Sequence, residues 1–218
     1  MKVKTFIGGF DNNLSYLLWC EKTRLAALVD TSVEPLEILE FIESEDLILE
    51  KILITHTHHD HIKYISDFKY KFPIINILLH PNPINKIGSH YSTLEHNEVI
   101  CVGKHLLTTL HTPGHFSDSI CFWNKEEGFI FTGDTVFIGR TGRTIGSNSS
   151  IQDLYKSVYK VILSCPHETI IYPGHHYGYK PYDTIDSNIK NSSFFQCSNF
   201  NEFKKVMEKF EKSKNNNK

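Results

Sequence analysis

Four side chains of the types that bind metal ions lie close together in the segment 56–61, and they are His56, His58, Asp60 and His61. The apolar run at 52–55, directly before them, is expected to form a buried strand. In extended backbone alternate side chains point to the same side, so His56 and His58 can converge on one ion. Asp60 and His61 come after the chain has to turn, so they can face a second ion. Imidazole and carboxylate ligands suit zinc, iron and manganese alike.

Three later segments share one form: a strand end, a glycine turn and then one side chain that can bind a metal. They are Thr112–His115, Thr132–Thr135 and Tyr172–His175, and they present His115, Asp134 and His175. Glycine lets the backbone turn without a Cβ clash, so the following side chain is offered at the edge of a sheet. A histidine-rich turn alone can be exposed and inert, but seven possible ligands at strand ends are hard to obtain by accident. We therefore predict a metal site built from all four segments.

The elements that must position these residues follow from hydrophobic periodicity and turn signals. Strands are expected at 3–7, 14–20, 25–29, 52–55, 74–79, 106–110, 120–123, 129–131 and 170–172. Helices are expected at 35–44 and 62–72, after a capping-box start at Ser150, and after the cap Asn199. Two similar halves with helices outside two facing sheets would explain this order. No linker separates the halves, so we expect one α/β domain over residues 1–211 and a disordered tail at 212–218.

The composition of the chain narrows the classes of function. Its 218 residues suit one domain, and a formal net charge of -2 offers no basic surface for nucleic acid. The N-terminus lacks a long apolar stretch, so we expect neither a signal peptide nor a membrane span. The five cysteines are widely spaced and never form a CxxC pair, which favours free thiols in a reducing cytoplasm. We expect a cytoplasmic monomer or homodimer that acts on a small molecule.

The HxHxDH pattern at 56–61, followed by a His, an Asp and a His that each come after a glycine, resembles the metallo-β-lactamase superfamily. The resemblance covers essentially the whole chain and implies a four-layer αββα sandwich. It implies that His56, His58 and His115 hold one metal ion and that Asp60, His61 and His175 hold a second. Asp134 would bridge both ions, and Asp60 and Asp134 would be catalytic. Asp30, at the end of the strand 25–29, would support the ligand loop.

Two stretches, 133–144 and 172–178, look like the branch of that superfamily that contains glyoxalase II (hydroxyacylglutathione hydrolase) and the persulfide dioxygenases. In that branch the substrate carries glutathione. The resemblance implies that Arg143 binds a glutathione carboxylate, for which a planar bidentate guanidinium is well suited.

Tyr177 and Lys190 are the other residues that this resemblance brings to the substrate. Lys190 belongs to the segment 184–190, which resembles a C-terminal segment of the branch, whereas Tyr177 could equally serve in packing. Two positions differ from the branch. Ile145 stands where an aromatic residue or an aspartate is usual, and His176 stands where an acid is usual.

Metal-assisted hydrolysis is the first hypothesis for the chemistry. A divalent ion lowers the pKa of bound water from ~15.7 toward ~7, and two ions can polarise a carbonyl and take up the charge of a tetrahedral intermediate. The expected reaction is cleavage of a thioester, such as an S-acylglutathione, by a metal-bound hydroxide. Two zinc ions are the expected cofactors, with iron(II) as the alternative.

Three other interpretations stay open. A persulfide dioxygenase would use one iron(II) held by His56, His115 and Asp134, with open positions for oxygen and sulfur. A scaffold that binds metal without catalysis would keep the same residues. Lactam hydrolysis is compatible with the metal site alone.

Overall fold

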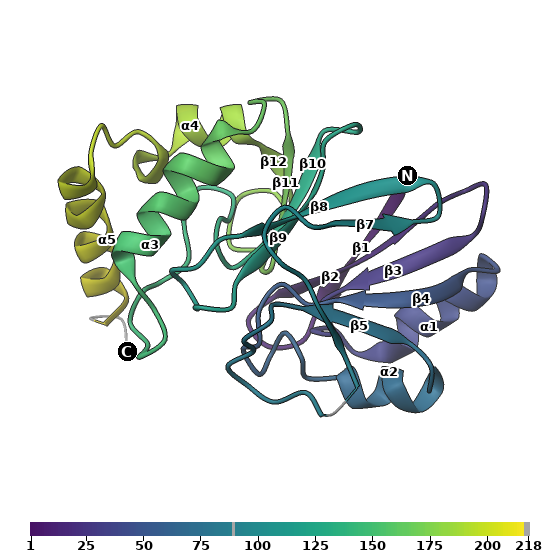
Figure 1. The fold of residues 1–218 in the computed structure, drawn as a ribbon. Coiled ribbons are helices and arrows are strands. Elements are labelled where there is room, and N and C mark those ends of the chain that lie inside the picture. The colour runs from purple at the N-terminus through teal and green to yellow at the C-terminus, as the bar shows by residue number, and fades with distance from the viewer. Residues whose placement is uncertain (89, 216–218) are drawn as a thin grey trace.

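Two six-stranded sheets frame the molecule, and the computed structural model describes residues 1–88 and 90–215. The first sheet contains, in spatial order, β1 (Lys2–Gly8), β2 (Asn13–Trp19), β3 (Leu25–Val29), β4 (Ile48–Leu53), β5 (Asn76–Leu79) and β6 (Ser92–Thr93). The second contains β12 (Asp183–Thr184), β11 (Ile170–Pro173), β10 (Phe129–Gly133), β9 (Ile120–Asn124), β8 (His105–His111) and β7 (Val99–Val102). Each sheet therefore comes from one continuous stretch of the chain, residues 2–93 for the first and residues 99–184 for the second (Figure 1).

Helices cover the outer face of each sheet, which gives four layers (Figure 1). The first sheet carries α1 (Pro35–Ser44) and α2 (Ile65–Lys71), and the second carries α3 (Ile151–Lys156), α4 (Ile185–Asn191) and α5 (Phe200–Asn215). A π-helical turn (Ser157–Val161) and two 3-10 turns (Ile162–Ser164 and Ser193–Phe195) complete the helical layer on the second sheet. The predicted αββα sandwich is confirmed.

Alternating side chains of the strands fill separate cores, as β2 illustrates. Leu14, Tyr16 and Leu18 face the second sheet, whereas Leu17 and Trp19 pack with the residues of α1 and α2. Successive side chains of a strand point to opposite faces, so one strand can supply both cores. A third core lies between the second sheet and its helices.

Two elements begin three or four residues away from the predicted start, for local reasons. β4 begins at Ile48 rather than at 52, because residues 48–51 already pair with residues 25–27 of β3. α2 begins at Ile65 rather than at 62, because the Tyr64 N–H bonds to the Thr31 carbonyl at 3.0 Å instead of entering the helix.

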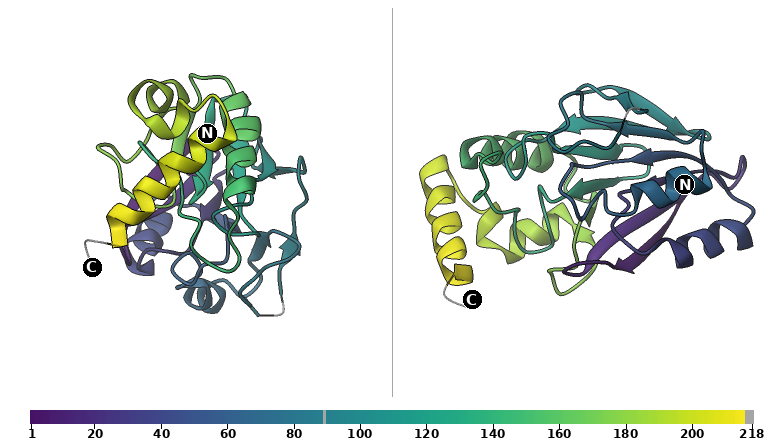
Figure 2. Two further views of the ribbon diagram at one scale, coloured as in Figure 1. Left: turned by 90° about the vertical axis from the view of Figure 1, so that its left-hand side faces the viewer. Right: turned by 90° about the horizontal axis from the view of Figure 1, so that it is seen from below.

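The C-terminal helix α5 is longer than predicted. Its start is as expected, since Asn199 Oδ1 accepts the Glu202 N–H at 3.1 Å. Phe203 and Met207 are fully buried and fix the helix beside α3 (Figure 2). The helix continues to Asn215, beyond the start of the tail predicted at 212, and residues 216–218 lie outside the described part of the chain. Disorder of the tail stays a prediction.

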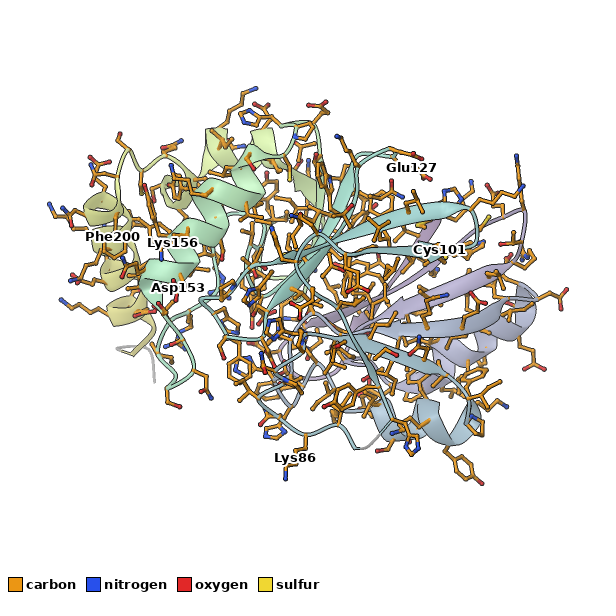
Figure 3. The ribbon with its side chains drawn as sticks, in the orientation of Figure 1. Lys86, Cys101, Glu127, Asp153, Lys156 and Phe200 are labelled. Carbon is orange, nitrogen blue, oxygen red and sulfur yellow. The ribbon has the colours of Figure 1, made fainter. Side chains whose placement is uncertain are left out.

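The thiols give a direct test of this packing. Cys101 lies on β7 and is exposed (Figure 3). The other four cysteines are buried. Burial raises the pKa of Cys121 to about 12, which keeps that thiol protonated and unreactive. We expect one of the five cysteines to react rapidly with a thiol reagent in native protein, and all five in denaturant. Cys101→Ser should abolish the rapid phase, and a rapid phase that persists in this variant would contradict the packing.

Candidate metal centre

The predicted ligands come from loops at the carboxyl ends of strands. His56 to His61 follow β4, Asp134 follows β10 and His175 follows β11. β4 runs parallel to β3, and β11 runs parallel to β10, so the loops of each pair leave at a common edge. His115 joins them from the loop after β8. Crevices outside the carboxyl ends of strands are the usual place for a site in α/β folds.

The first group of ligand atoms is formed by three imidazoles. His56 Nε2 lies 2.9 Å from His58 Nδ1, and His115 Nε2 lies 3.1 Å from the same atom. The three nitrogens therefore face one small volume and could hold an ion.

The second group combines a carboxylate with two imidazoles. His175 Nε2 lies 3.3 Å from His61 Nε2 and 3.3 Å from Asp60 Oδ2. His61 Nε2 and Asp60 Oδ2 are 3.6 Å apart. This arrangement could hold a second ion.

Asp134 lies between the two groups. Its Oδ2 is 3.4 Å from His115 Nε2 in the first group and 3.4 Å from His175 Nε2 in the second. Its Oδ1 is 3.3 Å from His61 Nε2 and has no hydrogen-bond partner among the described residues, although the side chain is buried. One carboxylate thus touches both groups, as a bridging ligand would.

The outer nitrogens of four imidazoles are bonded away from the cluster. These bonds are His56 Nδ1 to Thr55 Oγ1 at 3.2 Å, His61 Nδ1 to Asp30 Oδ2 at 2.8 Å, His115 Nδ1 to the Arg143 carbonyl at 2.9 Å and His175 Nδ1 to the Asp11 carbonyl at 3.0 Å. Carbonyl and carboxylate oxygens only accept, so His61, His115 and His175 carry a proton on the outer nitrogen and can turn a lone pair inward.

The cluster fits metal ions by both chemistry and size. Bonds of about 2.0–2.1 Å in a tetrahedral site place neighbouring ligands roughly 3.4 Å apart. The separations within the two groups run from 2.9 to 3.6 Å. Inward lone pairs and carboxylates at such distances repel one another unless a cation or a proton lies between them. The residues present therefore suit two divalent ions.

The electrostatics differ between the two groups. Desolvation lowers the pKa of His58 to about 4, and His115 adds to this effect. Burial also lowers the pKa of His175, but Asp134 and Asp60 outweigh it and raise the pKa to about 9. Burial would raise the pKa of Asp134, but His175 and His61 hold it well below its usual value. The second group thus attracts positive charge more strongly than the first group does. Protons compete with a metal ion for the ligands of the second group.

Asp30 supports the ligand loop, as predicted. Its Oδ2 binds His61 Nδ1 and accepts the Thr55 hydroxyl at 2.7 Å, and its Oδ1 accepts the Thr55 N–H at 2.8 Å. It is buried at the end of β3 with a φ of +54°, a conformation that Asp and Asn tolerate better than other L-residues. It therefore orients His61 and Thr55, the residue directly before His56, at the same time.

Two glycines make room for this packing. Gly133 has a φ of +48°, and a Cβ there would lie 2.5 Å from Thr55 Oγ1. A Cβ on Gly174 would collide with Asp134 Oδ1 and lie 2.7 Å from His61 Cε1. The glycines that precede Asp134 and His175 are therefore needed for close approach as well as for turning, which extends the role predicted for them.

The residues predicted for the substrate are divided between two places. The Tyr177 ring stacks on His175, with centroids 4.8 Å apart and planes at 5°, and its hydroxyl donates to Asp11 Oδ2 at 2.6 Å. Arg143 adjoins the cluster through its carbonyl bond to His115. Lys190 projects from α4, is exposed and binds Asp186 Oδ2 at 2.5 Å on the same helix. The structure does not bring Lys190 to the cluster, and its role at the substrate stays a prediction.

Several supporting residues were not predicted. Asn13 is buried at the start of β2, where its Nδ2 donates to Asp60 Oδ2 at 2.9 Å and lies 3.3 Å from His175 Nε2. Asp118 accepts the Thr57 hydroxyl and the Ile84 N–H. Phe116 packs on the His58 ring with centroids 3.9 Å apart. Phe116 and Asp118 could have been predicted to lie at the site, because they follow His115 closely in the chain. No motif near Asn13 indicates that it lies there.

The profile of the family described as "Metallo-beta-lactamase superfamily" matches residues 8–175, a segment that contains all seven residues of the cluster. The chain belongs to this superfamily. Within it, a probable hydroxyacylglutathione hydrolase of Schizosaccharomyces pombe is 34% identical over 191 residues, which cover 85% of this chain and 69% of that protein. A probable polyketide biosynthesis zinc-dependent hydrolase of Bacillus velezensis is 28% identical and is covered to 82% of its length, with 85% of this chain aligned. Among solved metallo-beta-lactamase folds, ETHE1 from Myxococcus xanthus superposes with a TM-score of 0.85 at 27% identity, over 95% of this chain and 90% of that one.

A search of the described residues for helices long and apolar enough to cross a membrane found none.

Asp30→Asn tests the support of the ligand loop. The amide retains the shape and tolerates the positive φ, but its single oxygen cannot replace both carboxylate oxygens. Its NH2 group must therefore face either the Thr55 N–H or the His61 Nδ1–H, which disturbs the loop or the His61 tautomer. We expect metal affinity to fall about 10- to 100-fold, measured by competition with a chelator of known affinity. Asp67→Asn, an exposed carboxylate on α2, is the matched control and should leave the affinity unchanged. Equal affinities in the two variants would show that Asp30 does not orient a ligand.

Proposed function

We propose that this protein is a metal-dependent thioester hydrolase with two divalent ions, and that its substrate is an S-acylglutathione or a closely similar thioester. The observation that carries the proposal is the pair of ligand groups joined by one buried carboxylate, Asp134. Relatives named hydroxyacylglutathione hydrolase, at about a third identity, supply the substrate class.

The roles of the residues follow from their places in the two groups. We assign His56, His58 and His115 to the first ion, and Asp60, His61 and His175 to the second. Asp134 would contribute to both positions, since its carboxylate lies beside both groups. Ions bound there would lower the pKa of a bound water and polarise the thioester carbonyl. Asp60 and Asp134 are the catalytic carboxylates, because they fix the position and charge of that pair of ions.

The chain's own residues prepare the site for this chemistry. Asn13 holds Asp60 Oδ2 at 2.9 Å, so this carboxylate presents a defined edge to the second group. Asp30 and the carbonyls of Arg143 and Asp11 fix three imidazole tautomers. Since these contacts are made before substrate binds, little reorganisation accompanies the reaction.

Zinc is the metal we propose for both positions. A dominant imidazole set with carboxylates is compatible with zinc and with iron(II). Two relatives are named zinc-dependent hydrolases, which supports zinc here. We also propose a cytoplasmic location, because all five cysteines are free thiols, as a reducing compartment would keep them.

The complete second group favours hydrolysis over a mononuclear dioxygenase. A single iron(II) on His56, His115 and Asp134 would leave Asp60, His61 and His175 without a purpose. Those three are nevertheless held by Asn13, Asp30 and the Asp11 carbonyl. Such support is expected of ligands that bind an ion.

The first test is the metal content and reaction of the purified protein. We expect about two metal ions per chain, and release of free thiol from S-lactoylglutathione that stops after chelation and returns on adding zinc. Glutathione persulfide should cause no oxygen uptake. Oxygen uptake by iron-loaded protein, without thioester hydrolysis by the zinc-loaded or iron-loaded form, would replace this proposal by the dioxygenase.

Two neighbouring histidines provide a matched pair of variants. His58 faces the first group, whereas His59 is exposed. We expect His58→Ala to lower kcat/KM for the thioester about 100- to 1000-fold and to reduce the bound metal, because the first ion loses one of its three imidazoles. His59→Ala should stay within about 2-fold of the wild type. Similar activities for the two variants would exclude His58 as a ligand.

A further inference from the structure

Arg140 is held in an aromatic box beside the metal centre. Its guanidinium carbon lies 3.8 Å from the ring centroid of Tyr177, 5.1 Å from that of Phe210 and 5.3 Å from that of Phe137. Such rings stabilise a cation through their faces and leave the edge of the guanidinium free to donate. Arg140 is therefore fixed in position without being neutralised.

Stacked rings connect Arg140 to the cluster. Tyr177, which covers the guanidinium, lies on the other side against His175 in a nearly parallel stack. Phe137 also contacts both Tyr177 and His175, with centroids 4.9 and 6.0 Å away. Arg140 thus lies one aromatic ring away from a residue of the second group.

The guanidinium groups of Arg140 and Arg143 are not paired with a carboxylate among the described residues. None of the ion pairs among the described residues includes Arg140 or Arg143. The Nε of each is buried without a hydrogen-bond partner among those residues. Burial lowers the pKa of Arg140 and Arg143 adds to this effect, while Tyr177, Asp134 and Asp11 oppose it. Buried donors of a cation are costly unless an anionic oxygen accepts from them.

The loop that carries both arginines is held firmly. Residues 136–141 form a turn in which Val136 and Thr141 make a β-bridge and the Phe137 N–H bonds to the Arg140 carbonyl at 2.8 Å. α5 then ties the following residues, because Glu211 Oε1 accepts the N–H and the hydroxyl of Thr144 at 2.8 and 3.1 Å. Because the loop is already ordered, binding of a ligand to the arginines would cost little conformational entropy.

We propose that Arg140 is a specificity-determining residue that, together with Arg143, binds an anionic oxygen group on the thiol half of the substrate. The group is a carboxylate or a phosphate, since both accept from guanidinium edges in a bidentate manner. The proposal rests on the proposed function for its thioester chemistry. It assigns Arg140 a role that the resemblance to glyoxalase II gives only to Arg143.

The experiment separates binding of the anion from the chemistry. Arg140→Gln removes the guanidinium and its charge and leaves a shorter, neutral polar side chain beside the box. For S-lactoylglutathione we expect KM to rise about 10- to 100-fold, because the variant loses one charged hydrogen-bonding group to the substrate. The value of kcat should stay within about 3-fold of the wild type. The lactoyl thioester of N-acetylcysteamine, which has no anionic group, should be hydrolysed equally by variant and wild type. Arg140→Lys should restore part of the loss, and Lys180→Ala, an exposed cation paired with Asp183, is the control that should change nothing.

Binding of non-hydrolysable probes gives a readout that does not depend on activity. We expect S-hexylglutathione or S-hexylphosphopantetheine to bind the wild type and to bind Arg140→Gln at least 10-fold more weakly, measured by calorimetry. The probe that shows this loss identifies carboxylate or phosphate as the group. If neither probe binds the wild type, or if each binds both proteins equally, the role of Arg140 is overturned. Equal losses on the charged and neutral thioesters would overturn it too.

The two proposals can fail independently. Wild-type protein that holds its metals but hydrolyses no thioester would overturn the proposed function. An Arg140-dependent loss of probe binding in that same protein would still support the anion site. Near-ultraviolet circular dichroism of each variant shows whether the aromatic box is intact, and Arg140→Lys is compared in place of Arg140→Gln if the latter does not fold.

Discussion

The structure depends on bringing five imidazoles and two carboxylates within hydrogen-bonding distance of one another at a sheet edge. Such a cluster is unfavourable in itself, because lone pairs and negative charges face each other at separations of 2.9 to 3.6 Å. It is maintained by bonds directed outward, among which the contact of His61 with Asp30 at 2.8 Å is the most deeply buried. The surrounding fold fixes these outer bonds, and a cation between the inner atoms relieves the repulsion.

Each layer of the sandwich contributes to that arrangement. Parallel pairing of β3 with β4 aligns Asp30 with the start of the ligand loop, and pairing of β10 with β11 aligns Asp134 with His175. The inter-sheet core then fixes the distance between the two halves of the cluster. Tyr16 illustrates this link, because it packs on Phe131 and donates its hydroxyl to the Pro173 carbonyl at 2.6 Å.

The sequence is sufficient to predict the layers and the members of the cluster, because both leave local patterns. A buried strand before His56 and a glycine before each of His115, Asp134 and His175 are such patterns, and the family match covers all of them. Asn13 could not be predicted, because its contact with Asp60 depends on how β2 enters the sheet beside the loop of His175. The helix after Asn199 could be predicted from its cap and its apolar face, but its end at Asn215 could not, because the residues after Phe210 are polar and leave no apolar pattern.

The family match ends at residue 175, whereas the helix that holds the arginine loop begins at Phe200. The sandwich up to His175 supplies all seven residues of the cluster as well as Arg140 itself, whereas α5 contacts the arginine loop from outside the matched segment. Under the proposed roles, Glu211 and Phe210 of α5 would therefore influence how Thr144 and Arg140 are presented to the thiol carrier. Exchange of the last helix in evolution or by recombination would retune the preferred thiol carrier while the reaction itself is inherited unchanged.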